Sequence, residues 1–543
     1  MKDGTMSARG QEEAEFDQPP LVGTEADQND VVIGRVICER ESPSLDKVLF
    51  RLLPGQDTTA GRVLGVRGKQ INGPSVLTLI RVEGVWEQNP HEDALSSTVS
   101  DVIPFETRYA PEGQSTVIYR AASADPLEEV VFKLDGSLDR IESVETLPLS
   151  GSPVVVVQPG LIAQALNFAP DSQSGLEVGT IHGLPDVTVR LRRDVVQTHI
   201  FFCGGIGRGK SYGRGVVAEE LWSHGVPQIN IDPLGEMVDA TTSLGGTNVR
   251  PGDGFSLPLS ALQPDEIIDS IPAINKGTNI ETLVQFAHES LLNQVLRGGK
   301  EFGVDALIAK IEELAPALEM KAQTFRPAML RARSLENIPY IGAPFDWEQE
   351  LTPGRIINID CRGLSVSDLR LIAAAVARDI QRLARARKIP FVVLSMDEAH
   401  LIAPNDDKVV TTQVLREIAR IGRHYRIGLI LTSQSPADLD RPLLKRLLTR
   451  FIFAIEPDQL ESLRGVFSDA PEAMIHRLTR APIGTCVLSG VSETVKHATL
   501  VDIRRRRTPV GGATPDIFAD LAKRGWTARR EIPTSTRDGQ PRS

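Results

Sequence analysis

The sequence lacks an apolar run long enough to cross a bilayer, and its first thirty residues lack the basic start and apolar core of a secretion signal. These residues are polar and acidic, which predicts a disordered lead over residues 1–30 of a cytoplasmic protein without membrane attachment. Cysteine is scarce, and the four residues stand far apart, as is typical of reduced structural thiols: Cys38, Cys203, Cys361 and Cys486. No histidine pair has metal-ligand spacing, so the only metal we expect is one carried in by a nucleotide.

Positive charge is in deficit over the whole chain, whose formal net charge is −11. This balance argues against a protein that coats nucleic acid with its entire surface, but it leaves room for a local basic channel. Basic residues gather in one stretch, where only three acids accompany them: Arg416, Arg420, Arg423, Arg426, Arg441, Lys445, Arg446 and Arg450. Charge patterning alone fits either a binding surface or a solvated cationic face.

The length of 543 residues is too great for one core and indicates two or three folded units. Short β-type runs separated by turns predict a small antiparallel β-barrel over residues 31–150. Residues 151–197 read as a linker and strands that join the barrel to the next unit. Residues 198–507 alternate apolar strand-length runs with helical periodicity, which predicts an α/β domain with a parallel sheet and a helical insert at about 265–345. Residues 508–543 form a C-terminal extension that we expect to be partly disordered.

The stretch "GGIGRGKS" has the spacing GxxxxGK[ST] and follows the apolar run "HIFFC". Glycines let backbone N–H groups point at phosphate oxygens at the start of a helix, so the stretch predicts a nucleoside triphosphate site. Lys210 would contact the β- and γ-phosphates, and the Ser211 hydroxyl would hold Mg²⁺. The alternative is a chance glycine-rich turn. The nucleotide-binding candidates are Gly204, Gly205, Ile206, Gly207, Arg208, Gly209, Lys210, Ser211 and Tyr212.

Hydrolysis requires a carboxylate at the end of a neighbouring strand to hold Mg²⁺ and a second group to activate water. The run "FVVLSMDEAH" supplies two adjacent carboxylates, of which Asp397 would bind Mg²⁺ and Glu398 would act as the general base. Acids also follow two other strands, at Asp232 with Glu236 and at Asp360. Asp232 and Asp360 are equally consistent with acids that cap the next helix.

A polar pair, Ser433 and Gln434, ends the apolar run "GLILTSQ". Gln434 would sense the γ-phosphate or position water, or alternatively would satisfy loop backbone. Arginines upstream of this run are candidates for a finger that reaches a neighbouring subunit's site. Among Arg420, Arg423 and Arg426, we expect Arg423 to take that role, because it follows Gly422 near a helix end.

The ordered set "GGIGRGKS", "INIDPLGE", "VVLSMDEAHLIAP", "REIARIGRHYRIGLILTSQSPADLD" and "APIGTCVLSG" resembles the HerA-like ATPases of the HerA/FtsK superfamily, which are RecA-like hexameric DNA translocases. The β-rich region is similar to the HAS barrel that precedes the motor in HerA proteins. The resemblance implies Lys210 and Ser211 on phosphate and Mg²⁺, Asp397 on Mg²⁺, Glu398 as base, Gln434 as sensor and Arg423 as a finger in trans. The chain departs from the family pattern at Ile206, Arg208 and Ser435.

This resemblance implies an ATP- and Mg²⁺-dependent, hexameric double-stranded DNA translocase or helicase. HerA relatives commonly act with a nuclease on the barrel side, which implies DNA-end processing or defence against phage with a nuclease or other effector as partner. Two alternatives stay open. One is an ATP-regulated scaffold that assembles an effector, and the other is a conjugation- or secretion-type motor, which would predict a membrane attachment.

Overall fold

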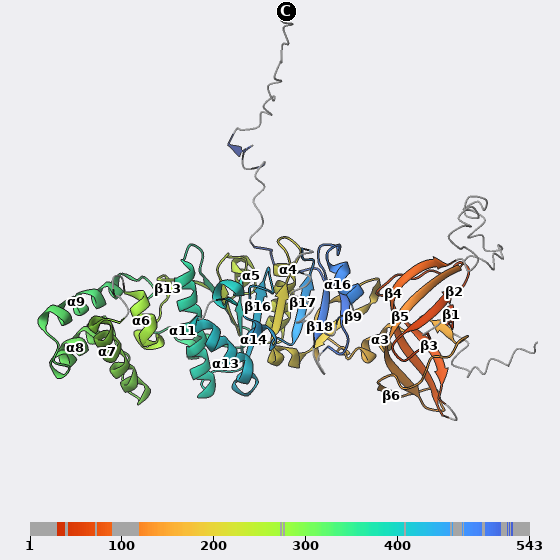
Figure 1. Cartoon of the computed structure of the whole chain (residues 1–543), viewed down its shortest axis with the longest axis horizontal. Helices are drawn as coiled ribbons and strands as arrows, with labels where there is room; N and C mark the ends of the chain where they lie inside the picture. The colour runs from red at the N-terminus through yellow and green to blue at the C-terminus, as the bar shows by residue number, and fades with distance from the viewer. Residues whose placement is uncertain are drawn as a thin grey trace, which may run out of the picture. The chain divides into compact units, whose positions relative to one another are not determined.

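The chain forms two compact units, Met1–Ala165 and Leu166–Ser543 (Figure 1). The computed structural model describes residues 30–511 with gaps at 39–41, 71–72, 89–118, 272–273, 275–276, 407–408, 457–458, 460–469, 471 and 491–494, together with residues 519, 521, 523 and 524. The acidic lead up to residue 29 and most of the predicted C-terminal extension lie outside the described residues.

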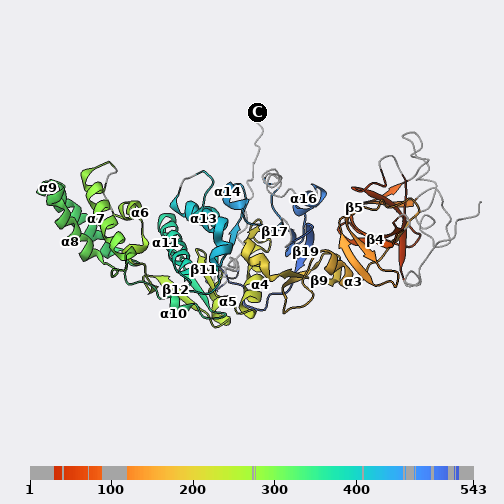
Figure 2. The ribbon, with the colours of Figure 1, turned by 90° about the horizontal axis from the view of Figure 1, so that it is seen from below.

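The first unit is a closed antiparallel barrel, as the sequence predicts. Its strands are β1 (Val32–Val36), β2 (Val48–Leu52), β3 (Val63–Lys69), β4 (Ser75–Gln88), β5 (Tyr119–Phe132), β6 (Leu138–Glu142) and β7 (Pro153–Val155). The order is β2-β1-β7-β3-β4-β5-β6, and pairing of β2 with β5 closes six strands into a ring with β6 attached to β5 (Figure 2). Alternate side chains point inward, and the core includes Phe50, Leu64 and Ile80, each fully buried.

The stretch predicted as a linker, residues 151–197, is divided between the two units. Strand β7 pairs with both β1 and β3, so it completes the barrel wall, and the helix α3 (Pro159–Ala165) ends the first unit. Strands β8 (Gly175–Ile181) and β9 (Leu184–Arg192) form a hairpin in the second sheet. Strand β7 is only three residues long, too short to show a strand periodicity in the sequence.

The second unit is built on one twelve-stranded sheet in the order β13-β12-β14-β11-β15-β16-β10-β17-β18-β19-β8-β9. Its other strands are β10 (Ile200–Cys203), β11 (Gln228–Asp232), β12 (Thr247–Pro251), β13 (Gly254–Phe255), β14 (Ile356–Asp360), β15 (Val392–Met396), β16 (Ile427–Ser433), β17 (Thr449–Phe453), β18 (Thr485–Gly490) and β19 (Thr499–Ile503).

Pairing is parallel from β13 to β17, as predicted, and antiparallel from β17 to β9. The sheet is therefore mixed. Antiparallel and parallel strands of similar length cannot be told apart by periodicity when both are buried on two faces.

Helices connect the parallel strands and supply the insert. They are α4 (Lys210–Ser223), α5 (Val238–Ser243), α6 (Pro264–Ser270), α7 (Asn279–Leu296), α8 (Val304–Ala317), α9 (Ala322–Ala332), α10 (Trp347–Glu350), α11 (Val366–Arg385), α12 (Ala399–Ile402), α13 (Val410–Tyr425), α14 (Arg441–Leu444) and α16 (Glu472–Leu478), with 3-10 turns η2 (Arg193–Thr198), η3 (Leu259–Ala261) and η4 (Arg333–Asn337).

The predicted helical insert corresponds to α6 through η4, between β13 and β14, and Figure 1 shows α7, α8 and α9 together at one end of this unit.

Candidate active site

Four loops meet at one edge of the second sheet, because the strands that precede them are parallel neighbours. Strands β11, β15, β16 and β10 lie side by side in that order, and their carboxyl ends therefore point the same way. The loop after β10 holds the glycine-rich motif, the turn after β15 holds Asp397 and Glu398, and β16 is followed by Gln434. Residues far apart in the chain thus share one site.

The glycine-rich loop runs from Gly204 to Gly209 between β10 and α4. Gly207 and Gly209 have positive φ angles of 70° and 110°, which residues with a side chain rarely adopt. Helix α4 begins at Lys210, so the N–H groups of its first turn have no preceding helical carbonyl and are available to an anion. This is the conformation that a phosphate-binding loop requires.

The loop packs against the antiparallel part of the sheet. Gly205 N donates to Ala454 O at 2.9 Å, and Gly484 N donates to Arg208 O at 3.2 Å. A Cβ atom on Gly204 would lie 2.7 Å from the Phe453 Cβ, so the loop fits only with glycine there. Ile206 is 81% exposed at the tip of the loop, and Arg208 is half-buried.

Glu398 joins the lysine of the loop to the glutamine after β16. Its Oε1 accepts from Lys210 Nζ at 3.1 Å and from Gln434 Nε2 at 2.9 Å. Its Oε2 lies 3.3 Å from His400 Nδ1. Lys210 and Glu398 are both nearly buried, so their charges interact with little screening by solvent. The structure thus brings together three residues that the sequence proposes separately.

Asp397 is buried and held on two sides. Its Oδ1 accepts from the Thr432 hydroxyl and from Glu398 N, and its Oδ2 lies 3.2 Å from Arg214 Nη1. Burial alone would raise the pKa of this carboxyl, but the charges of Arg214 and Lys210 and the Thr432 hydrogen bond outweigh it, and the pKa lies below its ordinary value. Asp397 is therefore an anion at neutral pH.

Glu236 approaches the same cluster from the loop after β11. Burial and the negative charge of Asp397 raise the pKa of Glu236, while a hydrogen bond from Ser211 and the charges of Arg214 and Lys210 oppose the rise. Glu236 thus connects the predicted metal ligand Ser211 to the acids at the end of β15.

Asp232 and Asp360 serve the loops that follow their own strands. Asp232 accepts from Gly235 N, Glu236 N and Met237 N at 2.7 to 3.0 Å, and so fixes the loop that carries Glu236. Asp360 binds Arg362 and Arg250, and these hydrogen bonds, of which that from Arg362 is the stronger, lower its pKa to about 2. Neither acid caps the next helix as the sequence suggested, because α5 has no side-chain cap and α11 is capped by Ser365. Asp232 and Asp360 instead hold groups in the loops that follow their strands.

The oxygen atoms at this site suit Mg²⁺, which prefers hard oxygen ligands. Among the described residues, four buried carboxylate oxygens have no hydrogen-bond partner, and three of them lie at this site: Glu236 Oε2, Asp397 Oδ2, which forms an ion pair with Arg214, and Glu398 Oε2, which lies near His400. Ser211 stands beside Glu236 on the first turn of α4. Ser211 and Asp397 are the residues that would hold the ion, which would neutralise charge on the phosphates.

The arginines before β16 have different environments. Arg420 and Arg426 are exposed, and Arg426 terminates α13 with a positive φ of 61°. Arg423 lies in the last turn of α13, and its side chain is outside the described part of the chain. Arg416 pairs with Asp440, with Nε to Oδ1 at 2.8 Å, and Arg450 is buried with its Nε bonded to Leu447 O, so these two have structural contacts.

Two residues of the site are absent from the sequence prediction, Thr432 and Arg214. Thr432 is a β-branched residue within an apolar strand, where it gives no sign of a polar role. Arg214 does leave a trace, since it places a charge between Gly213 and Gly215 on the helix that follows the loop, at a position that the core should occupy.

Residues 176–380 match the family model described as "Helicase HerA, central domain". This region contains the glycine-rich loop, α4 and the loop with Asp232 and Glu236. The chain is a P-loop ATPase, and residues 176–380 are similar to the central domain of HerA helicases. ATP and Mg²⁺ are its cofactors, in agreement with the loop conformation and with the oxygen atoms described above.

The chain also has distant similarity to solved structures. VirB4 of Thermoanaerobacter pseudethanolicus has a TM-score of 0.48 and 17% identity, over 62% of this chain and 97% of that one. The bacterial conjugative coupling protein TrwBΔN70 has a TM-score of 0.44 and 14% identity, over 65% and 94%. We draw no functional conclusion from values at this level. A search of curated proteins finds no match. In the described residues, no helix has both the length and the apolarity needed to span a membrane.

Proposed function

We propose that this HerA-type ATPase is a hexameric motor that translocates double-stranded DNA. The observation that supports the motor part of the proposal most directly is the set formed by buried Lys210, Asp397 and Glu398 and partly buried Gln434 at the carboxyl edge of the sheet. These residues provide the phosphate, metal, water and sensor contacts that ATP hydrolysis requires.

In the proposed cycle, Lys210 moves from Glu398 to the β- and γ-phosphates when ATP binds. Glu398 Oε1 then loses one of its two partners and becomes free to accept a proton from the attacking water. Gln434, which donates to the same oxygen, would report this change to the loop after β16. Ser211 and Asp397 would hold Mg²⁺, which would neutralise part of the phosphate charge.

Contact with DNA is proposed for exposed basic residues on the side of α13 and α14. These two helices are in contact, and the exposed residues are Arg420, Arg426, Arg441, Lys445 and Arg446. Such side chains bind phosphate without reading the sequence, so affinity would fall steeply with salt. A net charge of −11 is compatible with this arrangement because only the pore needs to be basic.

The test is the ATPase rate with and without duplex DNA, in the wild type and in Glu398→Gln. We expect duplex DNA to stimulate the wild type. Loss of the base should reduce turnover by about 10²- to 10⁴-fold while ATP binding is retained. The translocase proposal fails if DNA leaves the rate unchanged and Glu398→Gln preserves biological activity.

Arg423 is proposed as the finger in trans. Mixtures of Arg423→Ala subunits with Lys210→Ala subunits create interfaces that join an intact Lys210 to an intact Arg423. We expect these mixtures to recover part of the ATPase activity that each variant lacks alone. Arg416→Ala is the matched control, because Arg416 is engaged by Asp440. Absence of recovery at every ratio would exclude action in trans.

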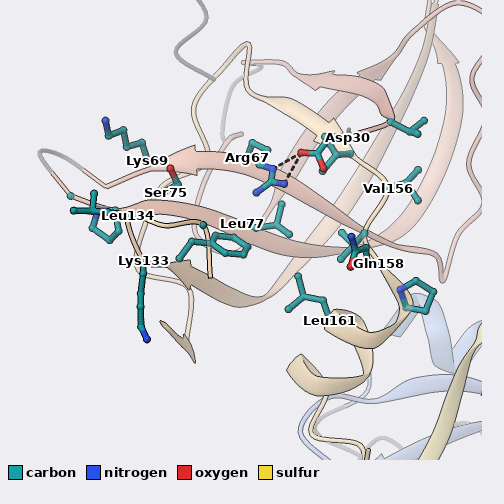
Figure 3. Close-up of a pocket in the computed structure, with 18 residues that line it drawn as sticks. Asp30, Arg67, Lys69, Ser75, Leu77, Lys133, Leu134, Val156, Gln158 and Leu161 are labelled. Carbon is teal, nitrogen blue, oxygen red and sulfur yellow. Dashed lines mark hydrogen bonds and ion pairs between the residues drawn. The ribbon is translucent and has the colours of Figure 1, made fainter. Parts of the chain in front are cut away.

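A partner is proposed on the barrel. A hollow of about 640 Å³ opens between the ends of β3, β4 and β5 and the segment from β7 to α3 (Figure 3). Its walls are apolar at Leu77, Phe132 and Leu161, and Leu134 at its rim is fully exposed. Lys69 and Lys133 also line it. We propose that a nuclease or other effector subunit docks here, in DNA-end processing or defence against phage.

The scaffold alternative makes a different prediction for the same hollow. Leu134→Asp should abolish effector binding in both cases. If the chain is only an ATP-regulated scaffold, Glu398→Gln should leave effector activity intact, whereas a translocase should lose it. Association with a membrane fraction would favour the conjugation- or secretion-type motor.

A further inference from the structure

The helix that follows the phosphate loop carries a buried arginine with no place in the mechanism given so far. Arg214 is only 2% exposed. Its Nε donates to Ser395 Oγ at 3.0 Å, its Nη2 lies 3.5 Å from Asn230 Oδ1, and its Nη1 lies 3.2 Å from Asp397 Oδ2. The guanidinium therefore contacts β11 and β15 at the level of the metal-binding acid.

A buried guanidinium is unfavourable unless an anion and hydrogen-bond acceptors compensate it. Asp397 is the anion, and the pair is nearly inaccessible, with both side chains 2% exposed. The arrangement is specific for arginine, since two of its nitrogens donate to residues on β15 and β11 and the third forms an ion pair with Asp397, directly after β15. A lysine would carry the charge, but it could not make all three contacts.

Charge balance gives this contact a function. Three carboxylates meet here, at Glu236, Asp397 and Glu398, and the charges of Lys210 and Arg214 act on this group. Once Lys210 turns to the triphosphate, Arg214 is the fixed cation that stays with the acids, because it lies behind Asp397 and within the core.

We propose that Arg214 is a positioning residue for the metal-binding carboxylate. Arg214 Nη1 forms an ion pair with Oδ2 of Asp397, and Thr432 and the backbone of Glu398 donate hydrogen bonds to Oδ1, so charge on one side and hydrogen bonds on the other favour one orientation of Asp397. The positive charge of Arg214 also weakens the attraction between these carboxylates and Mg²⁺. The proposal deepens the ATPase function and does not depend on DNA translocation.

The first test measures stability in the absence of nucleotide. Thermal unfolding of the wild type, Arg214→Met and Arg214→Lys is followed in EDTA and in saturating Mg²⁺. We expect Arg214→Met to have a lower melting temperature in EDTA, because three carboxylates lose their fixed cation, and Mg²⁺ should restore a large part of the loss. Arg214→Lys should resemble the wild type in its response to Mg²⁺.

The matched control is Arg504→Met. Arg504 also pairs with carboxylates of α4, at Glu219 and Glu220, which are nearly buried but lie away from the metal acids, although Arg504 itself is 11% exposed. Its melting temperature should also fall, but Mg²⁺ should not restore it. An equal response of the two methionine variants to Mg²⁺ would overturn the proposal and leave Arg214 with a purely structural role.

The second test separates metal use from catalysis. In Arg214→Met we expect the Mg²⁺ concentration for half-maximal ATPase activity to fall by about threefold or more, since a like charge near the ion is removed. We expect kcat to fall by about tenfold, with a smaller change in KM for ATP, because Asp397 loses its orientation. Unchanged Mg²⁺ dependence would contradict the inference.

A double-mutant comparison keeps the proposal testable if Arg214→Met folds poorly. Asp397→Asn alone leaves Arg214 buried without its anion, so it should destabilise the protein. Arg214→Met should then lower the free energy of unfolding less when it is added to Asp397→Asn than when it is made in the wild type. Additive losses would refute the coupling, whereas a wild type without any ATPase activity would instead refute the proposed function.

Discussion

At Glu398 the backbone is in the left-handed region, with φ 46° and ψ 50°. A residue with a side chain pays about 1–3 kcal/mol for such a conformation, which persists only where its surroundings impose it. Here Glu398 N donates to Asp397 Oδ1 and to Thr432 Oγ1, and the side chain is held by Lys210 and Gln434. The strain falls on the residue that we propose as the general base, and it aims the carboxylate back at the phosphate loop.

Arg208 adds a positive side chain to the loop that we propose as the phosphate site, at a position where the chain departs from the family pattern. We expect Arg208→Ser to raise KM for ATP by about two- to tenfold, because one charge interaction with phosphate is lost, and to change kcat little. The measurement is steady-state ATPase kinetics at low and high salt. Ile206→Ala, at the exposed tip of the same loop, is the control and should leave KM unchanged. A fall in kcat with constant KM would contradict this expectation.

His199 makes stability depend on pH. Burial lowers its pKa from 6.5 to about 4, and its Nδ1 accepts from Leu429 N at 3.0 Å. Below pH 6.5 the unfolded chain therefore binds a proton that the folded chain does not. The contribution of neutral His199 to the free energy of unfolding is fully present above pH 6.5. It is lost between pH 6.5 and pH 4, by about 1.4 kcal/mol per pH unit.

The test replaces His199 by asparagine, whose side-chain oxygen can accept the hydrogen bond from Leu429 N but does not titrate. We expect the drop in melting temperature between pH 7.5 and pH 5 to be smaller in His199→Asn than in the wild type. His224→Asn, at a partly exposed ring, should show the wild-type drop. Equal slopes in all three proteins would refute the role of His199.

Among the residues of the site, those that end a strand could be predicted from the sequence. Asp397, Glu398 and Gln434 follow long apolar runs, and Lys210 belongs to a motif with fixed spacing. Thr432 and Arg214 could not be predicted, because their partners lie on other strands and only the three-dimensional packing brings them together. The orientation of Asp397 thus depends on contacts between strands, which no local sequence pattern predicts.

At the scale of elements, the segment after β19 is attached to α4 by charge. Arg504 contacts Glu219 and Glu220 at 2.8 and 2.7 Å, and Glu219 also accepts from the backbone of Arg507 and Thr508. Arg506 N donates to the Tyr212 hydroxyl, two residues beyond Lys210. The segment therefore supports the same helix that presents the phosphate loop.

We expect Arg504→Ala to reduce the free energy of unfolding by about 3–5 kcal/mol, because two nearly buried carboxylates lose their cation. Urea denaturation of the second unit measures this. Arg505→Ala, one residue further along the same segment, is the control and should cost much less. A loss below about 1 kcal/mol would mean that solvent screens these pairs despite their burial.

At the scale of the molecule, the two units have separate cores. The barrel core comprises residues between Ile33 and Val154, and the larger core lies in the second unit. Their existence and class follow from the change of hydrophobic period along the chain. The antiparallel part of the second sheet cannot be predicted from the change of hydrophobic period, because the pairing of β19 with β8 joins segments that no sequence pattern relates.

Separate cores predict separate unfolding. We expect a fragment of residues 30–165 to unfold in one cooperative transition, and a fragment of residues 166–543 to bind ATP without the barrel. Calorimetry of the full chain and of each fragment, with and without ATP and Mg²⁺, checks this. ATP should raise only the transition of the second unit. A single transition of the full chain, shifted as a whole by ATP, would contradict it.

The pairing of β8 with β19 also sets an order of events during synthesis. His182, beside the β8–β9 turn, and Asp502 in β19 are hydrogen-bonded across 320 residues of chain. At the usual rate of about 5–20 residues per second, the β8–β9 hairpin waits roughly 15–60 s on the ribosome before its partner strand emerges. All strands of the barrel emerge long before β19. During translation the barrel is therefore complete while the edge of β8 that later pairs with β19 is still unpaired, and we expect a chaperone to shield that edge.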